Sequence, residues 1–228
     1  MEDLWVWIIL IVITILAYLL GSVNSSILIT KCMGADIREH GSGNAGATNM
    51  LRTYGKRFGA LVLVCDVLKG LLAVGGAILV EHMLAARFGA APSIALSMFS
   101  YCAAIAVVLG HNYPVFFGFR GGKGIATSGA VIFLLDWRIG LIVAITGVLL
   151  IVLTRYVSLG SIVAAVAFPV VTAIFTFWID RDENVLFFIC SIIIGLLAIV
   201  RHSANLRRLL SGTESKLGKK SDRPDQSK

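Results

Sequence analysis

The sequence predicts an all-α integral membrane protein with about seven transmembrane helices, of which the fourth and fifth are short. Of its 228 residues 57% are hydrophobic and only 14% are charged, which is far too apolar for an ordinary soluble domain. The polar residues gather in three clusters, at residues 36–57, 110–127 and 201–214, with long apolar runs between them. This distribution is typical of membrane helices joined by functional loops.

The first apolar run, residues 4–20, would rise about 26 Å as a helix, close to the thickness of the hydrocarbon core. A cleavable signal peptide would need a basic start and a small-residue cleavage site, whereas this chain starts Met1-Glu2-Asp3 and continues into Gly21-Ser22-Val23-Asn24. We therefore expect a retained first span.

Six further apolar runs are expected to complete the bundle. The fourth and fifth runs are joined by Asp136-Trp137-Arg138, which predicts a tight helical hairpin or a re-entrant pair. A single crossing over residues 125–153 is disfavoured because it would place Asp136 and Arg138 in the middle of the membrane. The six runs are residues 59–80, 92–109, 125–135, 139–153, 159–179 and 185–200.

The charges predict the orientation. On the seven-segment reading, sixteen of the twenty Lys and Arg residues fall on the face that carries the three clusters, and three fall on the other. The positive-inside rule then places the amino terminus outside and the clusters and carboxyl terminus in the cytoplasm. We expect one membrane domain, residues 1–210, followed by a polar, disordered cytoplasmic tail, residues 211–228. A basic face suits anionic lipids, so the charge alone implies no nucleic acid.

Two charged residues and four cysteines fall in or near the apolar runs. Asp66 and Lys69 are three residues apart, so they share a helix face and are expected to form an interior ion pair. A contribution of Lys69 to an anion site is the second interpretation. The cysteines show no C-x-x-C spacing and no clustering with histidine, so we expect no metal site and no disulfide.

The first cluster contains a glycine-rich loop. The loop has G-x-G-x-x-G spacing, but no strand precedes it and no βαβ unit follows, so a dinucleotide fold is not indicated. A glycine-rich loop can still approach an anion closely through its N–H groups. Glycines are also common in membrane turns, which is the alternative interpretation. The candidate anion-binding residues are Arg38, Gly41, Ser42, Gly43, Asn44, Thr48, Asn49 and Arg52.

The second cluster strengthens the interpretation as a phosphate site. Arg120-Gly121-Gly122-Lys123-Gly124 places two cations and three glycines directly before the run that starts at Ile125. The N–H groups at a helix amino terminus favour phosphate. The loop is not a Walker A motif, because Phe117 and Gly124 stand where that motif needs Gly and Ser or Thr. For His111 a structural role at the end of the third span is favoured.

The third cluster combines cations with a titratable histidine. Arg201, Asn205 and Arg208 are spaced to share one face of a helix that continues from the last span. His202 is a candidate acid or base, because its side chain titrates near neutral pH. Glu214 is expected to orient an arginine. The chain contains no G-x-S-x-G or H-E-x-x-H motif and no histidine with Asp five residues later.

With these motifs in view, the sequence resembles the acyl-phosphate:glycerol-3-phosphate acyltransferases of bacterial membranes (the PlsY family). The resemblance covers nearly the whole chain before the tail. It rests on DIREHGSGNAGATNMLRTYGKRFG, GHNYPVFFGFRGGKGIAT and RHSANLRRLLSGTE in this order, together with DVLKG at residues 66–70.

The resemblance implies transfer of a fatty acyl group from acyl phosphate to the 1-hydroxyl of sn-glycerol 3-phosphate, the first acylation of phospholipid synthesis. It implies recognition of glycerol 3-phosphate by residues 118–127, including Thr127, and essential roles for Ser42 and Arg52. It also favours functional roles for His202, Asn205 and Glu214. It further implies the inner membrane, a cytoplasmic active site and a soluble acyl-phosphate synthase as donor partner, with no cofactor.

The chemistry of the substrates agrees with these residues. Acyl phosphate has a good leaving group, so attack by a hydroxyl needs orientation and oxyanion stabilisation more than a strong base. We therefore expect direct transfer, with Ser42 as a donor and either His202 or a substrate phosphate as the proton acceptor. A transporter for a phosphorylated metabolite is the alternative, although the chain shows no internal repeat.

Overall fold

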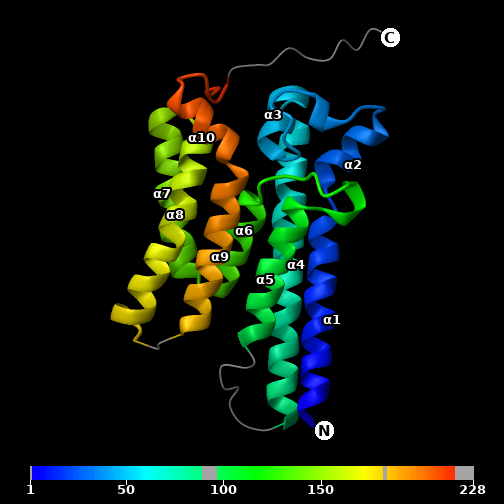
Figure 1. The fold of residues 1–228 in the computed structure, drawn as a ribbon, viewed down its shortest axis with the longest axis vertical. Helices are drawn as coiled ribbons and strands as arrows, with labels where there is room; N and C mark the ends of the chain where they lie inside the picture. The colour runs from blue at the N-terminus through cyan, green and yellow to red at the C-terminus, as the bar shows by residue number, and fades with distance from the viewer. Residues whose placement is uncertain (1, 89–96, 182–183, 219–228) are drawn as a thin grey trace.

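The structure is a computed structural model, which describes residues 2–88, 97–181 and 184–218. Within these ranges the regular elements are all helical (Figure 1). The long helices are α1 (Glu2–Ser22), α4 (Lys56–Phe88), α5 (Ser97–Asn112), α7 (Trp137–Thr154), α8 (Val157–Ile174) and α9 (Val185–Arg201). The shorter elements are α2 (Ser25–Cys32), η1 (Ile37–Glu39), α3 (Ala47–Tyr54), η2 (Val115–Phe117), α6 (Ile125–Leu135), the π-helix η3 (Phe175–Ile179) and α10 (Ser203–Leu210).

The predicted all-α membrane fold is confirmed, and each of the seven predicted apolar runs contains a helix. Five of the described helices are long and apolar enough to cross a membrane, and the bent pair α9 and α10 would make a sixth. Helix α6 has 11 residues and is too short to qualify. The first residues of the third predicted run, 92–96, lie outside the described residues, as do residues 219–228 of the predicted tail.

The helices form two groups with α6 between them. In Figure 1, α1, α4 and α5 lie side by side, and α7, α8 and α9 form the second group. Helix α6 packs against α4 on one side and α7 on the other. Helices α2, α3 and α10 gather at one end of the molecule, and the amino terminus lies at the opposite end (Figure 1). The three polar clusters therefore share one end.

Glycine allows the helices to approach closely. A Cβ added at Gly110 of α5 would overlap the carbonyl oxygen of Tyr18 in α1, and a Cβ at Gly160 of α8 would overlap that of Gly147 in α7. Small residues at such crossings are the usual means by which membrane helices pack, because backbones can then touch. The α1–α5 and α7–α8 contacts each depend on this.

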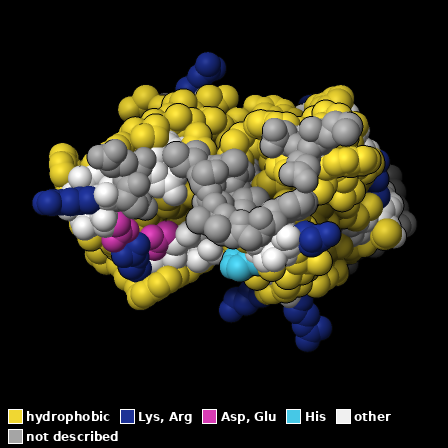
Figure 2. Space-filling model, turned by 90° about the horizontal axis from the view of Figure 1, so that it is seen from below, with side chains coloured by type: hydrophobic (Ala, Val, Ile, Leu, Met, Phe, Trp, Pro, Cys, Tyr) yellow, Lys and Arg dark blue, Asp and Glu magenta, His cyan; other side chains and the backbone are white. Residues whose placement is uncertain are grey.

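Helices α6 and α7 form a tight helical hairpin, which was one of the two predicted arrangements. Helix α6 ends before Asp136, whose carboxylate accepts hydrogen bonds from Arg138 N at 2.8 Å and Ile139 N at 3.3 Å. Asp136 therefore caps α7. The Arg138 guanidinium also lies 2.6 Å from Asp180, which ties the hairpin to the end of η3. Figure 2, a view of this end, shows scattered charges among hydrophobic side chains.

The predicted interior ion pair is part of a larger buried cluster. Lys69 Nζ lies 2.9 Å from Asp66 Oδ1 and 2.8 Å from His111 Nδ1, and it donates to Val23 O at 3.3 Å. Asp66, Lys69 and His111 are each at most 5% exposed. The cluster thus links α4 to α5 and to the turn after α1.

The last predicted helix does not continue straight through the third cluster, which corrects that expectation. Helix α9 ends at Arg201, and α10 runs at 57° to it. At the break, His202 Nδ1 donates to Ala198 O at 2.7 Å, while His202 N bonds to Ala198 O and Ile199 O. These bonds close the end of α9. Arg201 therefore lies on α9, whereas Asn205 and Arg208 lie on α10 and both bond to Glu214.

Candidate active site

Residues of all three clusters line one polar cavity of about 450 Å³ at the end where they gather. Helix α3 and the loop before it form one wall, and residues 123–126 form another. The start of α8 and the α9–α10 region complete the cavity. The polar lining residues are Ser42, Asn44, Thr48, Asn49, Arg52, Asp66, His111, Lys123, Ser158, Ser161, His202, Asn205, Glu214 and Ser215.

Asn49 holds the first glycine loop in shape. Its Oδ1 accepts from Ser42 N at 2.9 Å, and its Nδ2 donates to His40 O at 2.9 Å. Gly41 and Gly43 adopt φ of +60° and +69°, a region that favours glycine. The loop turns back on α3 and places the exposed Ser42 on the cavity wall. Asn49 therefore organises the loop, although it was predicted to bind phosphate.

The glycines of the second cluster serve close packing, which differs from the prediction. Gly121 N donates to Asn112 O at 3.2 Å and Gly122 N donates to His111 O at 3.0 Å, so these N–H groups satisfy the end of α5. A Cβ at Gly122 would overlap the His111 ring. Gly124 has φ of +76°, and α6 begins directly after it. The groups of this loop that face the cavity are therefore Lys123 and the first turn of α6, where Ile125 and Ala126 line the cavity.

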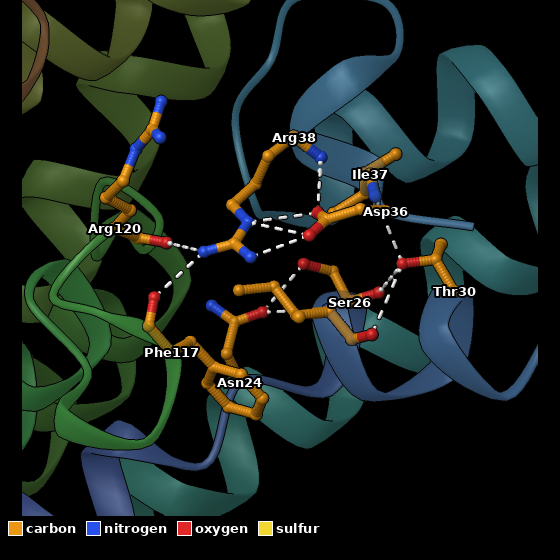
Figure 3. Close-up of polar contacts among 9 residues, drawn as sticks. Asn24, Ser26, Thr30, Asp36, Ile37, Arg38, Phe117 and Arg120 are labelled. Atoms are coloured by element: carbon orange, nitrogen blue, oxygen red, sulfur yellow. Dashed lines mark hydrogen bonds and ion pairs between the residues drawn. The ribbon is translucent and has the colours of Figure 1, made fainter. Parts of the chain in front are cut away.

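Arg38 supports the second loop from outside the cavity (Figure 3). Its Nη1 donates to Phe117 O at 2.8 Å, and its Nη2 and Nε donate to Asp36 at 2.6 Å and 2.9 Å. The Arg38 hydrogen bonds lower the pKa of Asp36, which keeps this pair charged. Among the described lining residues Arg38 is absent, so its predicted phosphate contact is replaced by a positioning role.

Arg201 supports the same loop from α9. Its Nε donates to Gly122 O at 2.9 Å and its Nη2 donates to Gly121 O at 2.9 Å, while the guanidinium lies 5.1 Å from the centre of the Tyr113 ring. Arg201 and Arg38 thus bind carbonyls of the loop from the third and first clusters. Thr127 is also structural, because its Oγ1 donates to Asp66 O at 3.1 Å.

Lys123 projects into the cavity and begins a chain of hydrogen bonds. Its Nζ donates to Asn205 Oδ1, and Asn205 Nδ2 donates to Glu214 Oε1 at 2.8 Å. Arg208 Nε donates to Glu214 Oε2 at 2.7 Å, and Ser158 Oγ donates to Oε1 at 2.9 Å. Burial raises the pKa of Glu214, but the bonds from Arg208, Asn205 and Ser158 prevail and lower it. Glu214 orients Arg208, as expected.

The cavity is electropositive around Lys123. Burial, followed by the charge of Arg208, lowers the pKa of the Lys123 ammonium to about 8, with Arg201 and Arg52 adding to the effect. A cation whose pKa is lowered by other cations gains most from an anion. A bound anion would therefore raise this pKa and stabilise the ammonium.

His202 offers one ring nitrogen to the cavity. Nδ1 donates to Ala198 O at 2.7 Å, which leaves Nε2 of the neutral ring as an acceptor. The side chain is 3% exposed and lines the cavity. This geometry holds the ring in one tautomer, and burial followed by the charge of Lys123 lowers the pKa of His202 to about 4, so the ring is neutral at pH 7.

The structure brings together some predicted residues and leaves others outside. Four polar lining residues were not selected from the sequence, namely His111, Ser158, Ser161 and Ser215. The spacing of Ser158 and Ser161 at the start of a span could have indicated one helix face. The predicted binding residues that lie outside the described lining are Arg38, Gly41, Gly43, Arg120, Gly121, Gly122, Thr127, Arg201 and Arg208.

A second, apolar cavity of about 380 Å³ adjoins the polar one. It lies among α6, α7, α8 and α9, with Leu63 of α4 at its edge. The two cavities adjoin, because they share the lining residues Leu63, Ile125, Ala126, Val148, Ile151 and Ser161.

The fold and the joined cavities define an integral membrane protein suited to hold an anionic group beside an apolar chain. Residues 11–212 match the family model described as glycerol-3-phosphate acyltransferase. The chain is 48% identical over 209 residues to the glycerol-3-phosphate acyltransferase of Thermoanaerobacter sp. (strain X514), which covers 91% of this chain and 96% of that one. Against the Clostridioides difficile (strain 630) protein of the same description, identity is 41% over 213 residues, covering 93% and 97%.

A crystal structure of PlsY, an integral membrane glycerol 3-phosphate acyltransferase, gives a TM-score of 0.74 in its glycerol 3-phosphate form. Identity is 40%, over 92% of this chain and 96% of that one. The lysophosphatidic acid form of PlsY gives a TM-score of 0.72. The chain therefore belongs to the glycerol-3-phosphate acyltransferase family and is an integral membrane acyltransferase.

Proposed function

We propose that the protein transfers a fatty acyl group from acyl phosphate to the 1-hydroxyl of sn-glycerol 3-phosphate, forming 1-acyl-sn-glycerol 3-phosphate and phosphate. The observation that carries the proposal is the junction of the two cavities. A cavity with Lys123 and Arg52 suits phosphate groups, and it adjoins an apolar cavity that suits a fatty chain. The glycerol 3-phosphate and lysophosphatidic acid forms of the solved relatives support this choice of substrate and product.

The cations offset the repulsion between the substrates. Acyl phosphate and glycerol 3-phosphate together carry roughly four negative charges near neutral pH, by analogy with phosphate monoesters. Lys123, Arg52 and the first turn of α6 would hold these groups close together. The acyl chain would lie in the apolar cavity, with its carbonyl carbon at the level of Ile125 and Ser161.

Transfer is then direct. The glycerol 1-oxygen forms a bond to the acyl carbonyl carbon, the bond from that carbon to the phosphate oxygen breaks, and phosphate leaves with the bonding electrons. The hydroxyl proton passes to His202 Nε2 or to an oxygen of the departing phosphate. Ser42 acts as a donor, because among the described residues no histidine or carboxylate bonds to its hydroxyl to activate it. Trapping of an acyl group on Ser42 would contradict this step.

The same proposal includes the membrane placement. Seven crossings, with α6 as the short one, would put the amino terminus outside and the site at the cytoplasmic face of the bacterial inner membrane. The excess of Lys and Arg at the clustered end supports this orientation. The donor would come from a soluble acyl-phosphate synthase, and no cofactor is needed.

The decisive assay uses purified protein in detergent with palmitoyl phosphate and glycerol 3-phosphate, and it measures phosphate and lysophosphatidate. Palmitoyl-CoA replaces the donor in a control. Lys123→Ala should abolish product, and Lys56→Ala, an exposed cation outside the lining, should not. Product from palmitoyl-CoA and none from palmitoyl phosphate would contradict acyl phosphate as the donor. Uptake of labelled glycerol 3-phosphate into liposomes without acylation would instead favour the transporter.

A further inference from the structure

The apolar cavity has a defined depth. It begins beside Ile125 at the first turn of α6 and reaches Phe133 near the end of that helix, a distance of about 12 Å at the rise of an α-helix. Along α7 it extends from Ile151 to Gly140, which corresponds to about 16 Å.

The far end is lined by side chains of α6 and α8. A Cβ at Gly140 would lie 2.9 Å from the Phe133 ring, so this ring packs directly on the start of α7. Phe168 of α8 also lines the cavity, is 1% exposed, and packs edge-on against Phe187 of α9 at 6.3 Å. We call this far end the floor: it is lined by Phe133, which is 41% exposed, by Gly140 and by the buried Phe168.

Gly129 keeps the middle of the cavity open. It lies one helical turn beyond Ile125 and lines the cavity, and a Cβ added there would meet no atom within 4 Å. Other glycines of the lining behave differently, because a Cβ at Gly160 or Gly195 would press on the backbone of α7 or α8. Gly129 is thus open to a larger side chain that would fill the cavity without displacing a helix.

We infer that the cavity measures acyl-chain length, with Gly129 setting its open bore and Phe133 its floor. The inference rests on the proposed function, because it takes the apolar cavity as the acyl site. An extended chain advances about 1.2 Å per single bond, from the reach of three backbone bonds. The cavity then houses about ten to fourteen carbons, and longer chains gain nothing from burial beyond the floor.

The test is the chain-length profile of kcat/KM for saturated acyl phosphates from hexanoyl to palmitoyl. In the unmodified protein kcat/KM should rise about fourfold per buried methylene and level off near the cavity depth. Gly129→Leu should level off at about six carbons while the KM for glycerol 3-phosphate stays unchanged. Phe133→Ala should move the plateau to longer chains.

Gly76→Leu is the matched control, because Gly76 is an exposed helical glycine of α4 with no atom within 4 Å of an added Cβ. Its profile should equal that of the unmodified protein. A Gly129→Leu profile that is unchanged, or lowered equally at all lengths, would overturn the inference. Binding of 1-acyl-glycerol 3-phosphates of the same lengths gives a second profile without catalysis. A failure of the acyl-phosphate donor is thereby distinguished from a failure of the length gauge.

Discussion

Lys123 Nζ donates a hydrogen bond to Asn205 Oδ1 across the polar cavity, between residues 82 positions apart in the chain. Asn205 is 5% exposed and its amide nitrogen donates to Glu214, which orients its oxygen as the acceptor for the ammonium. The pair joins the second and third clusters. It also fixes the lysine where the proposed phosphate would bind.

Asn205→Ala should therefore lower kcat/KM by about tenfold to a hundredfold, the usual effect of removing a hydrogen bond to a charged group. Steady-state kinetics for glycerol 3-phosphate measure this. Ser203→Ala, an exposed position on α10, serves as the control. Equal kinetics in both variants would contradict the positioning of Lys123 by Asn205.

The pH dependence should report Lys123. Its pKa of about 8 in the free protein means that the ammonium loses its proton above pH 8, whereas a bound phosphate dianion would raise that pKa. Binding then takes up a proton above pH 8, so the affinity for glycerol 3-phosphate is full below pH 8 and falls as the pH rises. Measured KM should increase from pH 8 to 10. In Lys123→Arg, whose side chain stays charged, this increase should disappear.

Arg201→Lys should lower kcat/KM although Arg201 is not among the residues that line the cavity. A lysine cannot make both bonds to Gly121 O and Gly122 O, so we expect about a tenfold loss in kcat/KM. Arg207→Lys, on the exposed side of α10, is the control. Kinetic constants that match in the two variants would show that the loop holds its shape without Arg201.

Lys69→Met should destabilise the fold by about 3–5 kcal/mol, because Asp66 would remain buried without its ammonium partner and with only His111, at 3.4 Å, beside it. The double variant Asp66→Asn with Lys69→Met should recover part of this loss. Thermal unfolding in detergent measures both, with Lys56→Met as the exposed control. A single variant as stable as the double would contradict a charge-based role for the pair.

The helices could be predicted because they depend on local composition. The gathering of the clusters could be predicted because it depends on the number of membrane crossings between them. The positions of α1, α4 and α9 follow from apolar runs, and Asp66 with Lys69 follows from helical spacing. The roles of Arg38 and Arg201 could not, since their partners Phe117 and Gly122 lie 79 residues away in sequence. The bend at His202 could not be predicted either, because no glycine or proline marks it in the sequence.

The eleven residues of α6 reach only about half of the roughly 30 Å hydrocarbon core. Its first turn, and with it the proposed phosphate site, would then sit within the leaflet. Pulling a palmitoyl tail into water would cost on the order of 12 kcal/mol, at about 0.8 kcal/mol per methylene. A recessed reaction centre removes this extraction step. The acyl chain stays in the hydrocarbon of the bilayer, and the small hydrophilic substrate enters the leaflet to reach it.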